Sequence, residues 1–116
     1  MSSLGTQFLF QCKSNYFENI RPSNVNCNNT EGYKTLIKIA SKFFKEKRYD
    51  EFILFFQEYQ YNVNLWAAHF VILYGCPNDK VKNEAIEIIE RYSNTPMDEK
   101  LATEEKEWLK KYHNRI

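Results

Sequence analysis

Backbone-breaking residues are scarce in this chain, and their scarcity limits the folds open to it. The 116 residues include only three glycines and three prolines. A sandwich or barrel with many tight turns needs these residues at its corners, whereas a few long helices do not. The length is about that of one domain, and a hydrophobic fraction of 43% is enough for a core without disulfides or metal. We therefore predict an all-α fold.

Apolar residues recur at helical spacing in five segments of the chain's main body. We predict helices at residues 33–47, from Asp50 to 59, from 62 or 64 to 74, from Asn78 or Asp79 to 92, and from Asp98 to 112. Gly75 is the predicted stop of the third helix. Short links of about two to six residues place consecutive helices antiparallel. The predicted architecture is a short stack of antiparallel helical hairpins with about five helices.

The predicted helices differ in the faces they must bury. The third is apolar on nearly every side, so it should lie centrally with neighbours on both flanks. The first is amphipathic, with apolar residues on one stripe and lysines on the other. For the second, we expect a buried stripe made of Phe52, Ile53, Phe55, Phe56 and Tyr59.

Residues 1–32 form an irregular N-terminal segment, which we expect to pack on the helical body at 33–116 as part of one globular unit. Leu9, Cys12, Tyr16 and Ile20 follow helical spacing, but a strand starting at Phe8 is also open. Residues 21–32 are polar and rich in asparagine, and they end at Gly32. Asparagine and glycine favour turns, so this stretch is predicted to be an exposed loop.

The overall charge and the cysteines bear on location. Sixteen basic and fifteen acidic residues give a net charge of +1, which carries no general signal for nucleic acid or membrane. Three cysteines without a CxxC pair suggest reduced thiols. No signal-peptide pattern is evident, and the most apolar run is about half the length of a membrane span. We expect a cytoplasmic protein with no membrane partner.

Candidate catalytic and metal-ligating residues are few. His69 lies in the most apolar helix, where a core residue bonded to a carbonyl is the favoured interpretation, and His113 is expected to be solvated. Cys76 is interpreted as a small buried residue in a turn. No nucleophile, phosphate-loop or zinc-ligand motif is present. We predict that the chain is not an enzyme and has no catalytic, metal or cofactor site.

Charge is distributed unevenly along the chain. Residues 33–48 carry six basic and one acidic residue, a local charge of +5, and residues 79–107 carry nine acidic and five basic residues, a local charge of −4. A solvated helix face explains this pattern without a function. An acidic surface also attracts a basic partner, such as a nuclease domain built to hold phosphates. The candidate partner-binding residues are Glu58, Tyr61, Asp79, Glu84, Glu87, Glu90, Asp98 and Glu99.

Three aromatic residues bracket the junction between the second and third predicted helices. Tyr59, Tyr61 and Trp66 cannot all be inside there. Tyrosine and tryptophan at a helix-hairpin rim are candidate binding hot spots, because each buries a large area at small entropic cost. Edge packing within the domain is the alternative.

Three stretches of the chain resemble a known family. Residues 62–74 (NVNLWAAHFVILY) resemble the opening helix of a HEAT-like repeat, and residues 84–90 (EAIEIIE) occupy the place of its second helix. Residues 97–111 (MDEKLATEEKEWLKK) look like the end of a small bacterial family of uncharacterised HEAT-like proteins. Several members are thought to be immunity proteins of polymorphic toxin systems, including contact-dependent inhibition. The resemblance covers residues 35–112, and it carries over no functional residues.

This resemblance implies an immunity protein that binds a cognate toxin, expected to be a nuclease, and covers its active site. A helical-repeat adaptor that binds a host protein or peptide is the alternative. Direct nucleic-acid binding through the basic helix at residues 34–48 is a further, less favoured possibility.

Overall fold

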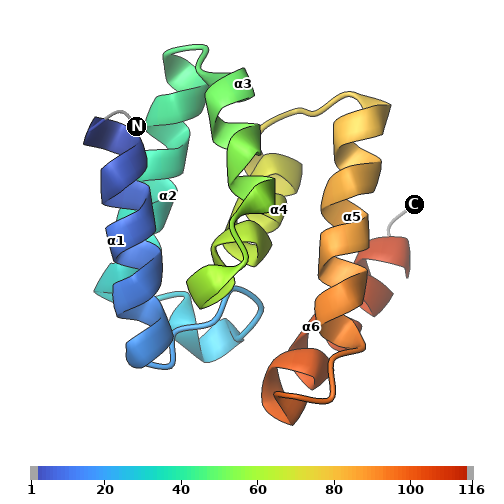
Figure 1. The fold of residues 1–116 in the computed structure, drawn as a ribbon. Coiled ribbons are helices and arrows are strands. Elements are labelled where there is room, and N and C mark those ends of the chain that lie inside the picture. Colours follow the sequence, from blue (N-terminus) through green and yellow to red (C-terminus); the bar gives the residue numbers. More distant parts are fainter. Residues whose placement is uncertain (1–2, 115–116) are drawn as a thin grey trace.

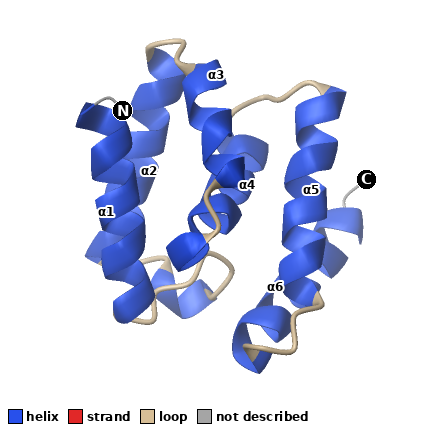
Figure 2. Cartoon of the chain, viewed as in Figure 1, coloured by secondary structure: helices blue, strands red, loops and turns tan. Residues whose placement is uncertain are grey.

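A computed structural model describes residues 3–114, and within that range the chain is helical, without strands (Figures 1 and 2). The all-α prediction is confirmed. Six α-helices and three short 3₁₀ helices follow one another in this described range. They are α1 (Ser3–Phe17), η1 (Val25–Cys27), α2 (Glu31–Lys45), α3 (Tyr49–Phe52), η2 (Ile53–Gln57), η3 (Gln60–Asn62), α4 (Val63–Tyr74), α5 (Asp79–Ser93) and α6 (Glu99–Asn114).

The helices are arranged as three antiparallel pairs side by side (Figure 1). Helices α1 and α2 form the first pair, and α5 and α6 form the last. Between them, α3 and η2 run in one direction and α4 returns in the other. The predicted stack of helical hairpins is therefore present, with α1 as a helix beyond the five predicted.

Helix α4 lies at the centre of the stack and is buried around its whole circumference. All nine residues from 63 to 71 are buried, among them Trp66 and Leu65 with no exposed surface. It contacts α1 and α2 on one flank and α5 on the other. A helix that is apolar all round must be covered all round, so the central position predicted for this segment is confirmed.

Helix ends follow the predicted local chemistry at two of the three proposed caps. The Asn78 side chain accepts the Val81 N–H at 2.9 Å at the start of α5, and Asp98 Oδ1 accepts the Leu101 N–H at 3.1 Å at the start of α6. Gly75 ends α4, as predicted, although the residue with a positive φ (47°) is the next one, Cys76.

The second predicted helix is wrong in its cap and its length. Asp50 lies inside α3, which lasts four residues before the chain tightens into the 3₁₀ helix η2. In a 3₁₀ helix, side chains three residues apart eclipse each other. Phe52 and Phe55 consequently face the same two rings, Phe8 at 5.1 and 4.6 Å and Phe43 at 5.3 and 5.9 Å. Tyr59 falls outside the buried stripe.

The N-terminal segment folds as helix α1, which settles the choice between helix and strand. Its buried stripe contains Leu4, Phe8, Cys12 and Asn15. Cys12 and Ile20 are buried as their spacing predicts, whereas Phe8 and Asn15 are buried in place of Leu9 and Tyr16. The carboxamide of Asn15 accepts a hydrogen bond from Gln11 Nε2 at 2.9 Å and donates one to the Gly32 carbonyl oxygen at 3.2 Å. Gly32 belongs to the first turn of α2 and has no positive φ, so it does not serve a turn.

Gly32 is required because the Asn15 side chain of α1 lies very close to it, and this yields a first prediction. A Cβ at this position would lie 2.2 Å from Asn15 Oδ1, so Gly32→Ala should lower the free energy of unfolding by about 1–3 kcal/mol, although alanine favours helices. In an Asn15→Ala background the same substitution should cost much less, because the clash with Asn15 is gone and only the tight contact with the end of the Ile20 side chain, at 3.0 Å, remains. Chemical denaturation of the four proteins measures this, and Gly32→Ala stabilising the otherwise native chain would contradict it.

Candidate functional site

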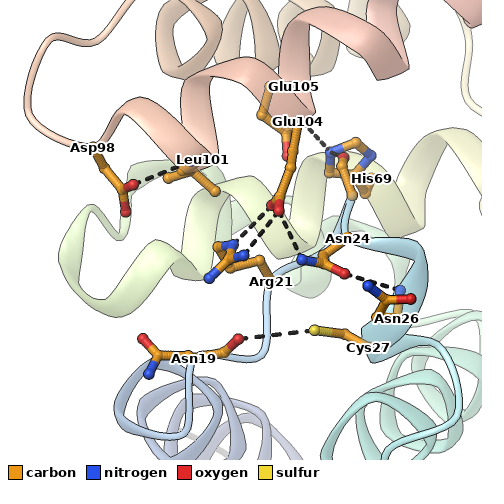
Figure 3. A network of polar contacts seen from close by, with 11 residues as sticks. Asn19, Arg21, Asn24, Asn26, Cys27, His69, Asp98, Leu101, Glu104 and Glu105 are labelled. Carbon is orange, nitrogen blue, oxygen red and sulfur yellow. Dashed lines mark hydrogen bonds and ion pairs between the residues drawn. The ribbon is translucent and has the colours of Figure 1, made fainter.

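The asparagine-rich loop is fastened to α6 by an ion pair (Figure 3). Arg21 Nε and Nη2 each donate to a different carboxylate oxygen of Glu104 at 2.8 Å, and Asn24 Nδ2 donates to Glu104 Oε2 at 2.7 Å. The hydrogen bond to Glu104 raises the pKa of Arg21 above its ordinary value. Such paired bonds are stronger than neutral ones. The predicted exposed loop is therefore exposed only in part: Val25, Asn26, Asn28 and Asn29 are exposed, but Pro22 and Cys27 are buried.

A second polar contact lies deeper, between α4 and α6. His69 Nε2 is 2.6 Å from Glu105 Oε1 and 3.1 Å from Ser23 Oγ. His69 is 2% exposed and Glu105 is fully buried. His69 is a core residue, as expected, but its partners are a carboxylate and a hydroxyl rather than a carbonyl. The sequence contains a signal for this buried carboxylate, because Glu105 lies on the buried stripe of α6 with Leu101 and Leu109.

The geometry of this contact differs from that of a nucleophile–base pair. In a Ser-His-acid triad, the serine and the carboxylate use different ring nitrogens of the histidine. Here Ser23 and Glu105 both meet Nε2, and the edge of the Trp108 ring packs against the imidazole at a centroid distance of 4.6 Å. Glu105 Oε2 is buried and has no hydrogen-bond partner in the described part of the chain. The arrangement clamps the loop and α6 onto α4.

The acidic residues of α5 lie where the sequence predicts, on its outer face. Glu84, Glu87 and Glu90 are exposed, and their carboxylates form no hydrogen bond or ion pair within residues 3–114. Glu87 and Glu90 line a shallow hollow together with Arg91 and Asn94. We call Glu84, Glu87 and Glu90 the α5 acidic face.

The remaining candidate residues lie in other places. Asp79 is exposed in the first turn of α5, and Glu99 is exposed in the first turn of α6. Glu58 is exposed beside η2, where it lines an apolar hollow with Leu54 and Phe55. Tyr61 packs against α1 instead of α5. The eight residues therefore do not form one patch.

The acidic surplus is smaller at the surface than in the sequence. Of the nine acidic residues at 79–107, Glu104 is paired with Arg21, and Glu105 is fully buried against His69. At the other end of the stack, Lys34, Lys38 and Lys42 of α2 are exposed. Figure 1 shows α2 and α5 in the two outer pairs, so these exposed lysines form a basic end of the molecule, opposite the α5 acidic face.

The three aromatic hot-spot candidates differ in their exposure and surroundings. Trp66 is completely buried, and its indole N–H has no hydrogen-bond partner among the described residues, so it is not at the rim. Tyr59 is 63% exposed and borders a pocket of about 190 Å³. The other residues lining this pocket are Asn64, Ile88, Arg91, Tyr92 and Thr95.

A cluster of exposed aromatic rings at the end of α1 was not predicted. Tyr16 and Phe17 are 48% and 66% exposed, and both rings contact Tyr61, at centroid distances of 5.5 and 5.7 Å. They border a hollow of about 270 Å³, which we call the aromatic hollow. Its lining residues are Tyr16, Phe17, Asn19, Ile20, Arg21, Asn62 and Asp98. The spacing of α1 had placed Tyr16 inside.

Three residues in or next to the aromatic hollow have a left-handed backbone conformation. Asn19, Tyr61 and Asn62 have positive φ angles of 59°, 54° and 59°. Left-handed backbone is uncommon outside glycine and is costly for a residue such as tyrosine. The strain at Tyr61 and Asn62 belongs to the sharp bend that brings η3 against α1.

The cysteines and histidines form no further site in the described range. Cys76 is exposed, so its interpretation as a buried turn residue is wrong, and Cys12 and Cys27 are buried. Burial raises the pKa of the Cys12 thiol well above its ordinary value. His113 is exposed near the end of α6, as predicted. Residues 3–114 contain no group of three or more His, Cys, Asp or Glu side chains placed to hold a metal ion.

Comparisons with family models, with curated proteins and with solved structures found no match to this chain. Among the helices of residues 3–114, none combines the length and the apolar character needed to cross a membrane.

The buried His69–Glu105 contact yields a second prediction. Glu105→Leu should lower the free energy of unfolding by about 3–5 kcal/mol, because it leaves the imidazole buried without its carboxylate. The double substitution His69→Leu with Glu105→Leu should recover most of this loss, since neither polar group remains. Glu107→Leu is a matched control on the exposed side of α6, and it should change stability by less than about 0.5 kcal/mol. Equal losses for Glu105→Leu and Glu107→Leu in urea denaturation would contradict the clamp.

A third prediction concerns alkaline pH. Burial raises the pKa of Tyr92 from 10.0 to about 12, although the charge of Arg91 acts in the opposite direction. A raised folded-state pKa contributes stability that is complete below pH 10 and is lost as the pH rises through 12. Thermal unfolding of Tyr92→Phe should therefore depend less on pH between 10 and 12 than that of the native chain. Identical pH profiles would contradict this.

Proposed function

We propose that this chain is an immunity protein that binds a basic toxin domain, such as a nuclease, and covers its active site. The α5 acidic face is the observation that carries the proposal. Its three carboxylates project from one helix at an outer edge of the stack, without ion-pair partners inside residues 3–114. Carboxylates in this state keep their full attraction for a cationic partner.

The mechanism needs no chemistry from this chain. Charge attraction speeds the encounter with a basic surface, and the body of the helical stack then blocks access to the partner's active site. The places of the charged residues support this mechanism. The clamp of His69 and Glu105 is buried inside the stack, while the acidic residues of α5 are exposed on its outside.

The adaptor alternative draws its support from a different place. The pocket beside Tyr59 is lined by Ile88 and the Tyr92 ring, with Arg91 and Thr95 as polar residues, and a peptide side chain could enter it. Binding of that kind depends on apolar burial and responds weakly to salt. The salt dependence of complex formation therefore separates the two functions.

A fourth prediction tests the proposal. The toxin candidate is the product of the gene next to the one that encodes this chain. Replacing Glu84, Glu87 and Glu90 with lysine should slow its association with that product by about tenfold or more at low salt, because the electrostatic attraction becomes repulsion. Surface plasmon resonance at several salt concentrations measures the effect.

The matched control changes three exposed residues at the basic end. The control variant carries Lys34→Glu, Lys38→Glu and Lys42→Glu on α2, which change the net charge by the same magnitude in the opposite direction. This variant should keep the native association rate or exceed it. Unchanged affinity after the α5 substitutions, in a variant with a native thermal transition, rejects the acidic-face mechanism.

A further inference from the structure

We propose that the aromatic hollow receives an arginine side chain of the partner protein. This inference rests on the proposed function for the identity of the partner, but the hollow can be tested without that partner. Two exposed rings, Tyr16 and Phe17, border the hollow, and the carboxylate of Asp98 also lines it. Aromatic faces and a carboxylate together are the chemistry that recognises a cation.

The charged groups in and beside the hollow favour the binding of a cation. Arg21 is the one basic side chain among the residues that line it, and both of its bonded nitrogens are taken by Glu104. Asp98 adds a second carboxylate, close enough to contribute to the raised pKa of Arg21 after the leading effect of Glu104. Asp98 Oδ1 accepts the Leu101 N–H, and within residues 3–114 Oδ2 accepts no hydrogen bond, so it can receive an incoming donor. One guanidinium between two carboxylates leaves a net negative charge.

The ring cluster already attracts a cation of the chain itself. Lys13 Nζ lies 5.5 Å from the centre of the Tyr61 ring, within the range of a cation–π interaction. Tyr61 is partly buried, whereas Tyr16 and Phe17 remain exposed at the hollow. A second cation can therefore approach those two rings from solvent.

Arginine fits this setting better than lysine. Its planar, weakly hydrated guanidinium stacks on aromatic faces while its edge donates hydrogen bonds to oxygen. Two further polar residues, Asn19 and Asn62, also line the hollow. The volume of about 270 Å³ gives room for a single long side chain rather than for a folded element.

The experiment titrates the full-length, ¹⁵N-labelled protein with the peptide acetyl-Gly-Arg-Gly-amide at low salt. The proposal predicts backbone shifts concentrated at residues 16, 17, 61, 62 and 98. The peptide with citrulline in place of arginine has the same shape without the charge, and it should produce none of these shifts. A peptide with lysine should bind more weakly than the arginine peptide.

Two substitutions with matched controls locate the effect. Asp98→Asn keeps a side chain that caps α6 but removes the charge, and Phe17→Leu keeps an apolar side chain but removes the ring. Each should raise the dissociation constant of the arginine peptide about two- to fivefold. Phe10→Leu is the control for Phe17→Leu, because Phe10 is on the same helix and is equally exposed (67% against 66%), and it should have no effect.

Equal shifts with the citrulline or lysine peptide, or shifts spread over the protein, would overturn the inference. So would native affinity in both Asp98→Asn and Phe17→Leu. The proposed function would fail in a different experiment. There, the association with the toxin candidate is measured after charge reversal on α5, and no peptide is used. A hollow that binds the arginine peptide in a protein whose α5 substitutions have no effect would reject only the acidic-face mechanism.

Discussion

The burial of α4 on every side is the constraint on which the rest of the structure depends. An apolar helix with no solvent face needs neighbours around its whole circumference. The pair α1 and α2 covers one flank, and α5 covers the other. Two polar residues, Asn64 and His69, are buried in this helix, and His69 is tolerated because Glu105 and Ser23 satisfy it. The need to satisfy that imidazole holds α6 and the loop of residues 21–24 against α4.

The predictable part of the fold is the part governed by local chemistry. The amphipathic stripes of α2 and α5, the uniform apolarity of α4 and the caps at Asn78 and Asp98 depend on residues within a few positions of one another. The break between α3 and η2 does not. It depends on contacts with Phe43 of the preceding helix and with Phe8, which is distant in sequence; both rings contact Phe52 and Phe55. No periodicity in residues 49–57 contains that information.

The same distinction applies to the candidate site. Exposure of Glu84, Glu87 and Glu90 follows from the helical period of α5 and was predictable. The pairing of Arg21 with Glu104 joins residues 83 positions apart and removes one acidic residue from the surface. The aromatic hollow joins the end of α1, η3 and the start of α6, so its composition depends on how the pairs stack. The sequence singled out Asp98, which lines the hollow, and Tyr61, whose ring contacts Tyr16 and Phe17, but not the hollow itself.

Two surfaces of different character result from this stacking. The α5 acidic face supplies long-range attraction, and the aromatic hollow supplies a short-range contact for one side chain. The loop of residues 94–98 connects the end of α5 with Asp98, which lines the hollow. Under the proposed function, a single basic partner would meet both, first through charge and then through an inserted arginine.

A growth assay tests the central claim most directly, namely that this chain acts by covering another protein. The toxin candidate encoded by the adjacent gene is expressed from an inducible promoter, with and without this chain. The account predicts that the toxin candidate alone arrests growth and that co-expression restores it. Growth arrest that persists despite stable co-expression of this chain, or the absence of any complex between the two purified proteins, would contradict the account.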